Sequence, residues 1–180
     1  MNIKIKRTND ELKASRPTED EIKKIPKLPI SILVENVRSV HNVGSIFRTA
    51  DAFIIEKIIL CGITASPPHK DIQKTALGST ESVEWEYQKD ICLAIKDLKK
   101  QGFYIWSIEQ TENSSKLNKL KISNELKHAI ILGNEVKGVS QNAIDLSDDV
   151  IEIPQFGTKH SLNVSACSAI LIWEFYNALS

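Results

Sequence analysis

Residues 30–61 read ISILVENVRSVHNVGSIFRTADAFIIEKIILC, and this stretch decides the fold class. It begins and ends with apolar runs of strand length, at residues 30–34 and 57–61. The residues between these runs repeat at the i, i+3, i+4, i+7 spacing of a helix with one buried face: Val43, Ile46, Phe47 and Ala50. A strand, a helix and a second strand in this order predict two parallel strands joined by a crossover helix over residues 41–52.

The rest of the chain repeats this alternation. Further strands are predicted at residues 103–107, 129–132 and 150–153, and further helices at residues 90–100, about 140–146 and 161–179. The fold class is therefore α/β, with a mainly parallel sheet and helices on both faces. In the last helix, the buried stripe is expected to be Leu162, Ala166, Ala169, Trp173 and Tyr176, widened by Ile170 and Ile172.

The first 29 residues differ in composition from the rest of the chain. The whole chain balances 23 Lys and Arg against 23 Asp and Glu, but residues 1–30 hold eight basic side chains against five acidic ones. We expect residues 1–29 to form a charged arm, helical from about Thr18, and residues 30–180 to form one domain. An arm that is merely solvated is the alternative interpretation, and about 29 residues are too few for a core of their own.

Composition excludes several classes of protein. A hydrophobic fraction of 42% with 7 Gly and 6 Pro excludes collagen-like and wholly disordered chains. No apolar run approaches the roughly 18 residues that span a bilayer, and the N-terminus lacks the apolar core of a secretion signal, so we expect a cytoplasmic protein without a membrane partner. The three cysteines are far apart and the four histidines form no ligand pair, which predicts no metal site.

Polar residues collect in three clusters at the predicted carboxyl ends of strands, where open α/β sheets bind their ligands. These clusters are residues 35–48, 133–138 and 153–163. Each cluster alone has a structural interpretation, with Asn42 or Ser161 as helix caps and Gly133 and Gly138 as turn glycines. Gly44 lies one turn before Arg48, which suggests that something approaches the helix backbone beside the guanidinium. The alternative interpretation is that Arg48 only extends over the edge of the sheet. Known signatures of nicotinamide enzymes, P-loop NTPases, α/β-hydrolases and zinc proteases are absent from the sequence.

Taken together and in this order, the clusters resemble the SpoU (TrmH) family of RNA ribose 2′-O-methyltransferases, in the SPOUT superfamily. The matching segments are residues 42–48, with the pattern Asn-x-Gly-x-x-x-Arg, residues 132–138 and residues 153–165. The resemblance extends from about Ile30 to Leu179. Ile54 and Ile55 stand where the family often has a glycine, which should alter only a turn.

The resemblance implies a C-terminal deep trefoil knot, a rare exception to unknotted topology, and a homodimer. It also implies that S-adenosylmethionine binds in the knot loops and that the methyl acceptor is a ribose 2′-OH in tRNA or rRNA. The cofactor-binding residues that it implies are Leu132, Gly133, Ile153, Gly157 and Leu162, with Ser107 as a weaker candidate. Gly133 and Gly157 would let the backbone approach the ligand closely.

The catalytic residues implied by the resemblance are Asn42, Arg48, Glu135, Ser161 and Asn163. A guanidinium keeps its proton in proteins, so we expect Arg48 to hold a phosphate and the developing oxyanion rather than to act as the base. Ser161 and Asn163, in the predicted first turn of the last helix, are expected to hold the 2′-OH and a phosphate, and Glu135 to orient Arg48 or Asn42. The competing hypothesis is a non-catalytic knotted RNA-binding or assembly factor. A third class, a cofactor enzyme that acts on a small molecule, would be expected to carry a phosphate-binding motif, and this sequence has none.

Overall fold

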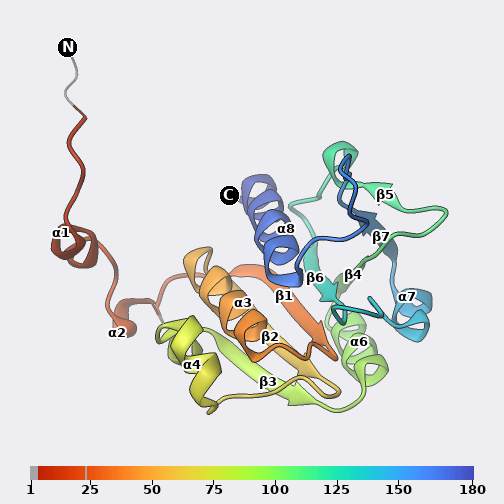
Figure 1. Cartoon of the computed structure of the whole chain (residues 1–180), viewed down its shortest axis with the longest axis horizontal. Coiled ribbons are helices and arrows are strands. Elements are labelled where there is room, and N and C mark those ends of the chain that lie inside the picture. Colours follow the sequence, from red (N-terminus) through yellow and green to blue (C-terminus); the bar gives the residue numbers. More distant parts are fainter. Residues whose placement is uncertain (1–3, 23) are drawn as a thin grey trace.

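The computed structural model describes residues 4–22 and 24–180, and its centre is one seven-stranded sheet (Figure 1). The strands are β1 (Leu28–Glu35), β2 (Ile55–Cys61), β3 (Glu84–Gln88), β4 (Phe103–Ile108), β5 (Ser115–Lys116), β6 (Lys127–Leu132) and β7 (Asp149–Glu152). Their order in the sheet is β3-β2-β1-β6-β4-β7-β5, and these strands all pair in parallel. The predicted parallel sheet is confirmed.

Helices cover both faces of this sheet, as the sequence predicts. The helices of the body are α3 (Val40–Ala52), α4 (Lys70–Ala76), α5 (Ser79–Ser82), α6 (Ile91–Lys100), α7 (Gln141–Leu146) and α8 (Val164–Leu179), with a 3-10 turn, η1, at Leu117–Lys119. One apolar core joins the sheet to α3, α4 and α8, and a second core joins its other face to α6 and α7. The sheet is therefore buried on both sides.

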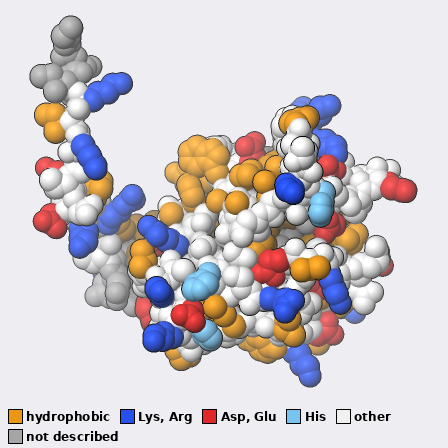
Figure 2. All heavy atoms as spheres, viewed as in Figure 1, with side chains coloured by type: hydrophobic (Ala, Val, Ile, Leu, Met, Phe, Trp, Pro, Cys, Tyr) orange, Lys and Arg blue, Asp and Glu red, His pale blue; other side chains and the backbone are white. Residues whose placement is uncertain are grey.

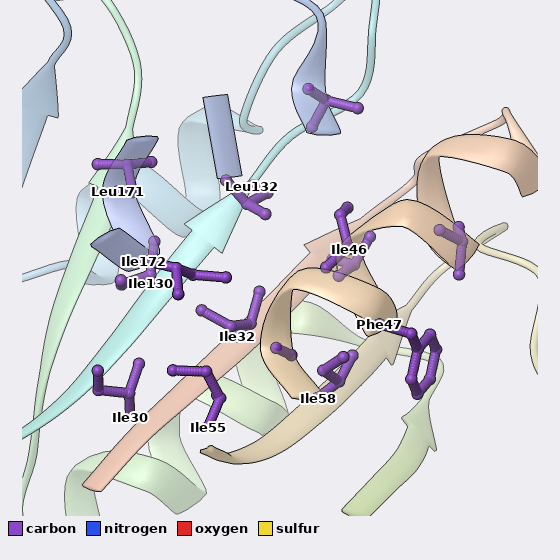
Figure 3. Close-up of a cluster of buried hydrophobic side chains, with 14 of the residues drawn as sticks. Ile30, Ile32, Ile46, Phe47, Ile55, Ile58, Ile130, Leu132, Leu171 and Ile172 are labelled. Atoms are coloured by element: carbon purple, nitrogen blue, oxygen red, sulfur yellow. The ribbon is translucent and has the colours of Figure 1, made fainter. Parts of the chain in front are cut away.

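Alternation along the central strands separates the two cores. Ile30, Ile32 and Val34 of β1 belong to the core under α3 and α8, whereas Leu33 belongs to the core under α6. Figure 3 shows the first core, where side chains of β1, β2 and β6 lie beside those of α3 and α8. Each fully buried aliphatic side chain contributes roughly 1.5–3 kcal/mol, so these two layers fix the strand ends that carry the polar clusters.

The edge strands β3 and β5 and the helix α4 were not predicted from the sequence. Strand β3, at one edge, has no fully buried residue, and β5, at the other edge, has only two residues, so neither carries a buried apolar run. Helix α4 explains Gly44. A Cβ atom on Gly44 would lie 2.6 Å from the carbonyl oxygen of Ile72, so the close approach at this glycine is made by α4.

The last helix begins at Val164 rather than at the predicted Ser161. Asn163 is its N-cap, and the side-chain oxygen of Asn163 accepts from the backbone N–H groups of Ser165 (2.9 Å) and Ala166 (3.4 Å). The predicted buried stripe is wrong. Its residues Leu162 and Trp173 are 41% and 51% exposed, and of the two residues predicted to widen it Ile172 is buried whereas Ile170 is 41% exposed. The other buried residues of the helix are Val164, Ser168, Leu171 and Phe175. Apolar residues surround most of this helix, so periodicity alone selected the wrong face.

Before β1 the chain leaves the body as an extended arm with two short helices, α1 (Asn9–Ala14) and α2 (Glu19–Ile22) (Figure 1). Thr8 and Glu11 form a capping box at the start of α1, and no residue of α1 is buried. Figure 2 shows Lys and Arg side chains spaced along this arm. Residues 1–3 and Lys23 of the predicted arm lie outside the described residues. In the described ranges, no helix is both long and apolar enough to cross a bilayer.

Candidate functional site

A cavity of about 650 Å³ opens at the carboxyl ends of β4, β6 and β7. Its walls are residues 108–111, 132–139, 141, 144, 151–153, 155, 160–164 and 167. The predicted cofactor residues Leu132, Gly133, Ile153 and Leu162 all line it. Its volume is typical of sites for small molecules and cofactors, and its walls combine apolar side chains with many polar ones.

Two of the predicted cofactor residues do not belong to this cavity. Ser107 is fully buried, and its hydroxyl is 2.7 Å from the hydroxyl of Ser147, so its side chain is held away from the cavity. Gly157 is exposed in the loop after β7, and a Cβ atom there would meet nothing within 4 Å. Neither residue lines the cavity, and their role in cofactor binding stays a prediction.

Sequence reasoning missed part of the wall that follows β4. Glu109 and Gln110 line the cavity, and the Gln110 side chain donates to the carbonyl oxygen of His160 at 2.6 Å. This bond ties the loop after β4 to the loop after β7. Both residues follow the strand predicted at 103–107, so the strand-end rule that located the three clusters could have included them.

Glu135 joins the second polar cluster to the first. Its carboxylate accepts from the backbone N–H groups of Arg38 (3.0 Å) and Ser39 (2.9 Å) and from the Nδ2 of Asn42 (3.0 Å). Burial by itself would raise the pKa of the Glu135 carboxyl, but these three donors, together with the residue's own backbone N–H, outweigh it and lower the pKa below its usual value. The carboxylate is therefore ionised at neutral pH and fixes the start of α3.

Asn42 and Asn163 join the first cluster to the third. Nδ2 of Asn163 donates to Oδ1 of Asn42 at 3.2 Å, while Oδ1 of Asn163 caps α8. Because Asn42 also donates to Glu135, one chain of hydrogen bonds connects all three polar clusters, although they lie far apart in sequence. We call Glu135, Asn42 and Asn163 the connecting network.

Arg48 and Ser161 lie at different distances from this network. Ser161 lines the cavity in the loop just before Asn163, outside α8. Arg48 is exposed on α3, six residues after Asn42 and thus about 9 Å farther along the helix axis, and it is not part of the cavity wall. Glu135 contacts Asn42 and makes no hydrogen bond or ion pair with Arg48 among the described residues. Of the two residues that Glu135 was expected to orient, Arg48 and Asn42, it therefore contacts Asn42.

The neighbouring backbone leaves no room for a side chain at Gly133. A Cβ atom on Gly133 would lie 2.5 Å from the carbonyl oxygen of Gly138, and the N–H and C=O groups of Asn134 and Gly138 bond each other at 3.0 and 2.9 Å, which keeps this backbone from moving aside. We expect Gly133→Ala to destabilise the fold by about 1–3 kcal/mol. Gly157→Ala should change stability by less than about 0.5 kcal/mol. Urea unfolding of both variants checks this pair, and equal midpoints would contradict it.

No metal-binding arrangement is found within residues 4–22 and 24–180, where no three His, Cys, Asp or Glu side chains gather as ligands would. The polar groups of the site are instead held by one another and by backbone N–H groups. The arrangement can bind a ligand in the cavity and present amide and hydroxyl groups at its mouth.

The relatives found by comparison with known proteins are named as RNA methyltransferases. An uncharacterized tRNA/rRNA methyltransferase of Borreliella burgdorferi is 34% identical over 149 residues, which cover 83% of this chain and 64% of that protein. A tRNA (guanosine(18)-2′-O)-methyltransferase of Thermus thermophilus is 29% identical over 161 residues, covering 89% of this chain and 81% of that protein. The chain therefore spans somewhat less than two thirds of the first relative's length.

Solved structures share the fold. The TrmH/SpoU tRNA modifying enzyme of A. aeolicus superposes with a TM-score of 0.78 at 23% identity, covering 89% of this chain and 83% of that one. An AdoMet-bound rRNA methyltransferase of Sinorhizobium meliloti also gives 0.78 at 23% identity, over 88% of this chain and 60% of that one. The model of the SpoU rRNA Methylase family matches residues 29–173, which include all three polar clusters and the connecting network. The chain therefore belongs to the SpoU rRNA Methylase family.

Proposed function

We propose that this chain transfers a methyl group from S-adenosylmethionine to the ribose 2′-OH of a nucleotide in tRNA or rRNA. The observation that carries the proposal is the connecting network, which fixes the start of α3 and the start of α8 at the mouth of the cavity. Family membership supports it, since the Thermus relative is named for this reaction on tRNA. We place its action in the cytoplasm because that is where such a substrate would be met.

The cavity suits the proposed cofactor. Leu132, Ile153 and Leu162 give it an apolar surface for an adenine ring, and neighbouring main-chain groups can bond the ring edge. The S. meliloti structure named above is described as AdoMet-bound, and the same ligand is proposed here. When bound, S-adenosylmethionine supplies a methyl group that is activated by a positively charged sulfur.

The residues of the chain then have two tasks, which are to orient the ribose hydroxyl and to let its proton leave. Asn163 has one Nδ2 hydrogen left after its bond to Asn42, and Ser161 lines the cavity beside it, so both are proposed to hold the 2′-OH and the adjacent phosphate. Arg48, exposed and outside the cavity wall, is proposed to hold a phosphate and stabilise developing negative charge, while the proton leaves through phosphate or water.

Two measurements on the intact chain test the function. Isothermal titration should detect binding of S-adenosylmethionine, and incubation with labelled cofactor should place the label in bulk tRNA or rRNA as nucleotides whose 2′-O-methyl group protects the linkage from alkali. Activity should persist in EDTA, since no metal is proposed. A folded chain that binds RNA but no cofactor would instead favour the RNA-binding or assembly factor.

The N-terminal arm is proposed to contact RNA. It extends from the body and carries basic side chains along its length (Figure 2). Lys4, Lys6 and Arg7 are among its exposed basic residues. Deleting residues 1–25 should weaken RNA binding and reduce its salt dependence, because fewer phosphates are neutralised, while cofactor affinity stays the same. Filter binding at several salt concentrations measures the effect; unchanged RNA affinity would refute this role.

The exposed face of α8 is proposed to pair with a second copy of the chain. Trp173 is 51% exposed and Ile170 41% exposed, and Trp173 stacks with Tyr176 beside Phe53. Figure 2 shows hydrophobic side chains gathered near the C-terminal end of this helix. An apolar patch of this kind typically marks a protein interface.

Trp173→Glu should convert the homodimer to a monomer, because it places a charge at the centre of this face. Leu93→Glu is the matched control, since Leu93 is 49% exposed but lies on α6, across the sheet. Light scattering after size exclusion measures both masses. Dimerisation that survives Trp173→Glu, or is lost equally in the control, would rule out this face.

The trefoil knot is proposed for the segment after β7. This strand lies beyond β4, whereas α8 packs on α3, so the chain returns across the sheet between them. The bond from Gln110 to His160 brings its path against the loop after β4, which supports threading there. A chain circularised through its termini should then migrate faster in a denaturing gel than an unknotted circle of equal length, and equal mobility would refute the knot.

A further inference from the structure

Three carboxylates line the cavity, and two of them have an evident partner. Glu135 belongs to the connecting network. Glu152 forms an ion pair with Lys116 and accepts from the Ser114 hydroxyl at 2.7 Å. The third, Glu109, makes no ion pair with a cationic side chain among the described residues. No cationic side chain of the described residues therefore pairs with its carboxylate, which bonds only backbone N–H groups at the wall of the cavity.

Glu109 is nevertheless held firmly in place. Its own N–H donates to the carbonyl oxygen of Ile151 at 3.0 Å, and its carboxylate accepts from the N–H groups of Val139 (3.0 Å) and Gln110 (2.8 Å). Gly138 leaves the room that this carboxylate occupies, because a Cβ atom there would lie 2.9 Å from Cδ of Glu109. The side chain is therefore fixed before any ligand arrives, which lowers the entropic cost of binding.

Each oxygen of this carboxylate still has room to accept a further hydrogen bond. A carboxylate offers about four acceptor positions, and the two backbone N–H groups use one on each oxygen. Two free positions on adjacent oxygens match a pair of neighbouring hydroxyl groups. A ribose carries such a pair, and acidic side chains bind ribose hydroxyls in other nucleotide sites.

We infer that Glu109 binds the ribose hydroxyls of the S-adenosylmethionine that the proposed function requires. Glu109 directly follows Ile108, and its N–H bonds to Ile151; both line the same cavity as Leu132, Ile153 and Leu162, which are proposed to hold the adenine. The ribose is joined directly to the adenine, whereas the ammonium group lies at the far end of the molecule. A carboxylate beside the adenine site is therefore placed to bind the two ribose hydroxyls rather than the ammonium group.

The test uses titration calorimetry of the full chain with two probes, S-adenosylhomocysteine and 5′-methylthioadenosine. Both contain the ribose, but only the first contains the amino-acid group. Glu109→Gln should weaken both by a similar factor, about tenfold to a hundredfold, as expected for a hydrogen bond to a charged group. Glu112→Gln, an exposed carboxylate on the same loop that does not line the cavity, should bind as the unchanged chain does. Weakening of S-adenosylhomocysteine alone would assign Glu109 to the ammonium group and overturn the inference.

A second comparison distinguishes two explanations for weaker binding by Glu109→Gln, which are the loss of a bond to the ribose and a loosening of the loop at Val139. Removing the 2′- or 3′-hydroxyl from 5′-methylthioadenosine should weaken binding to the unchanged chain but have little further effect in Glu109→Gln. Equal penalties in both proteins would show that Glu109 acts only on the loop, and the inference would fail while the proposed function stands. If the unchanged, folded chain binds neither probe nor S-adenosylmethionine, the proposed function fails as well.

Discussion

Replacing Arg48 with alanine is expected to slow methyl transfer by about a hundredfold to a thousandfold, the usual cost of losing one group that stabilises developing charge. Arg48 is exposed on α3 and contributes nothing to either core, so the variant should fold normally. It is also absent from the cavity wall, so the affinity for S-adenosylmethionine should not change. Single-turnover rates with saturating cofactor measure the loss. Lys96→Ala, on the far side of the sheet, is the control and should keep full activity.

The lysine variant distinguishes two roles for Arg48. If Arg48 holds phosphate, Arg48→Lys keeps the positive charge but loses the bidentate geometry, so it should bind RNA more weakly and still transfer methyl groups in single turnovers at high pH. If the guanidinium were the base, Arg48→Lys would bind RNA normally and lose the chemical step entirely. The second result would contradict the role proposed here.

Replacing Glu135 with alanine should produce the second largest effect, because it removes the acceptor of three donors at once. The N–H groups of Arg38 and Ser39 and the side chain of Asn42 would lose their partner, and Asn42 would no longer hold Asn163 in place. We expect a loss of stability of about 1–2 kcal/mol, at the low end for three bonds because the backbone N–H groups of Arg38 and Ser39 can bond water instead. Methyl transfer should fall about a hundredfold, since a positioned group is misplaced. Activity within about twofold of the unchanged chain would exclude the connecting network from catalysis.

The stability difference between the unchanged chain and Glu135→Gln should depend on pH. Because the pKa of Glu135 is lowered in the folded state, its contribution is fully present above the unfolded value near 4.5 and is lost as the pH falls through the folded value. Melting temperatures measured from about pH 7 down to about pH 4 should therefore begin to converge below about pH 4.5. A difference that grows on acidification would contradict this assignment.

Sequence patterns predicted the centre of the fold and missed its margins, for a physical reason. Strands β1, β2, β4 and β6 are buried on both faces and consist of apolar runs, which leave a strong signal. Edge strand β3 mixes Glu with Trp and Tyr because one side faces solvent, and the seven residues of α4 are too few for a clear period. Helix α8 has apolar residues on two faces, one for the sheet and one exposed. The rule of one buried stripe could not choose between them.

Several residues of the candidate site were predicted from the sequence, but the hydrogen bonds that join them were not. Asn42, Glu135 and Asn163 were identified by resemblance, but the sequence does not show that they bond one another, because that depends on how three loops meet. Ser107 was assigned by its place at a strand end, yet its side chain points to Ser147. Glu109 was missed because only its contacts in the folded chain show that it is fixed at the cavity wall.

Methylation of a ribose 2′-oxygen in RNA by this chain is tested most directly by mapping 2′-O-methyl groups on total RNA from a strain that lacks the gene. We predict that a specific tRNA or rRNA nucleotide loses its 2′-O-methyl group in that strain. The purified chain with S-adenosylmethionine should restore the modification to the isolated RNA, and Arg48→Ala should not. An unchanged methylation map, together with no methyl transfer by the purified chain, would contradict the claim.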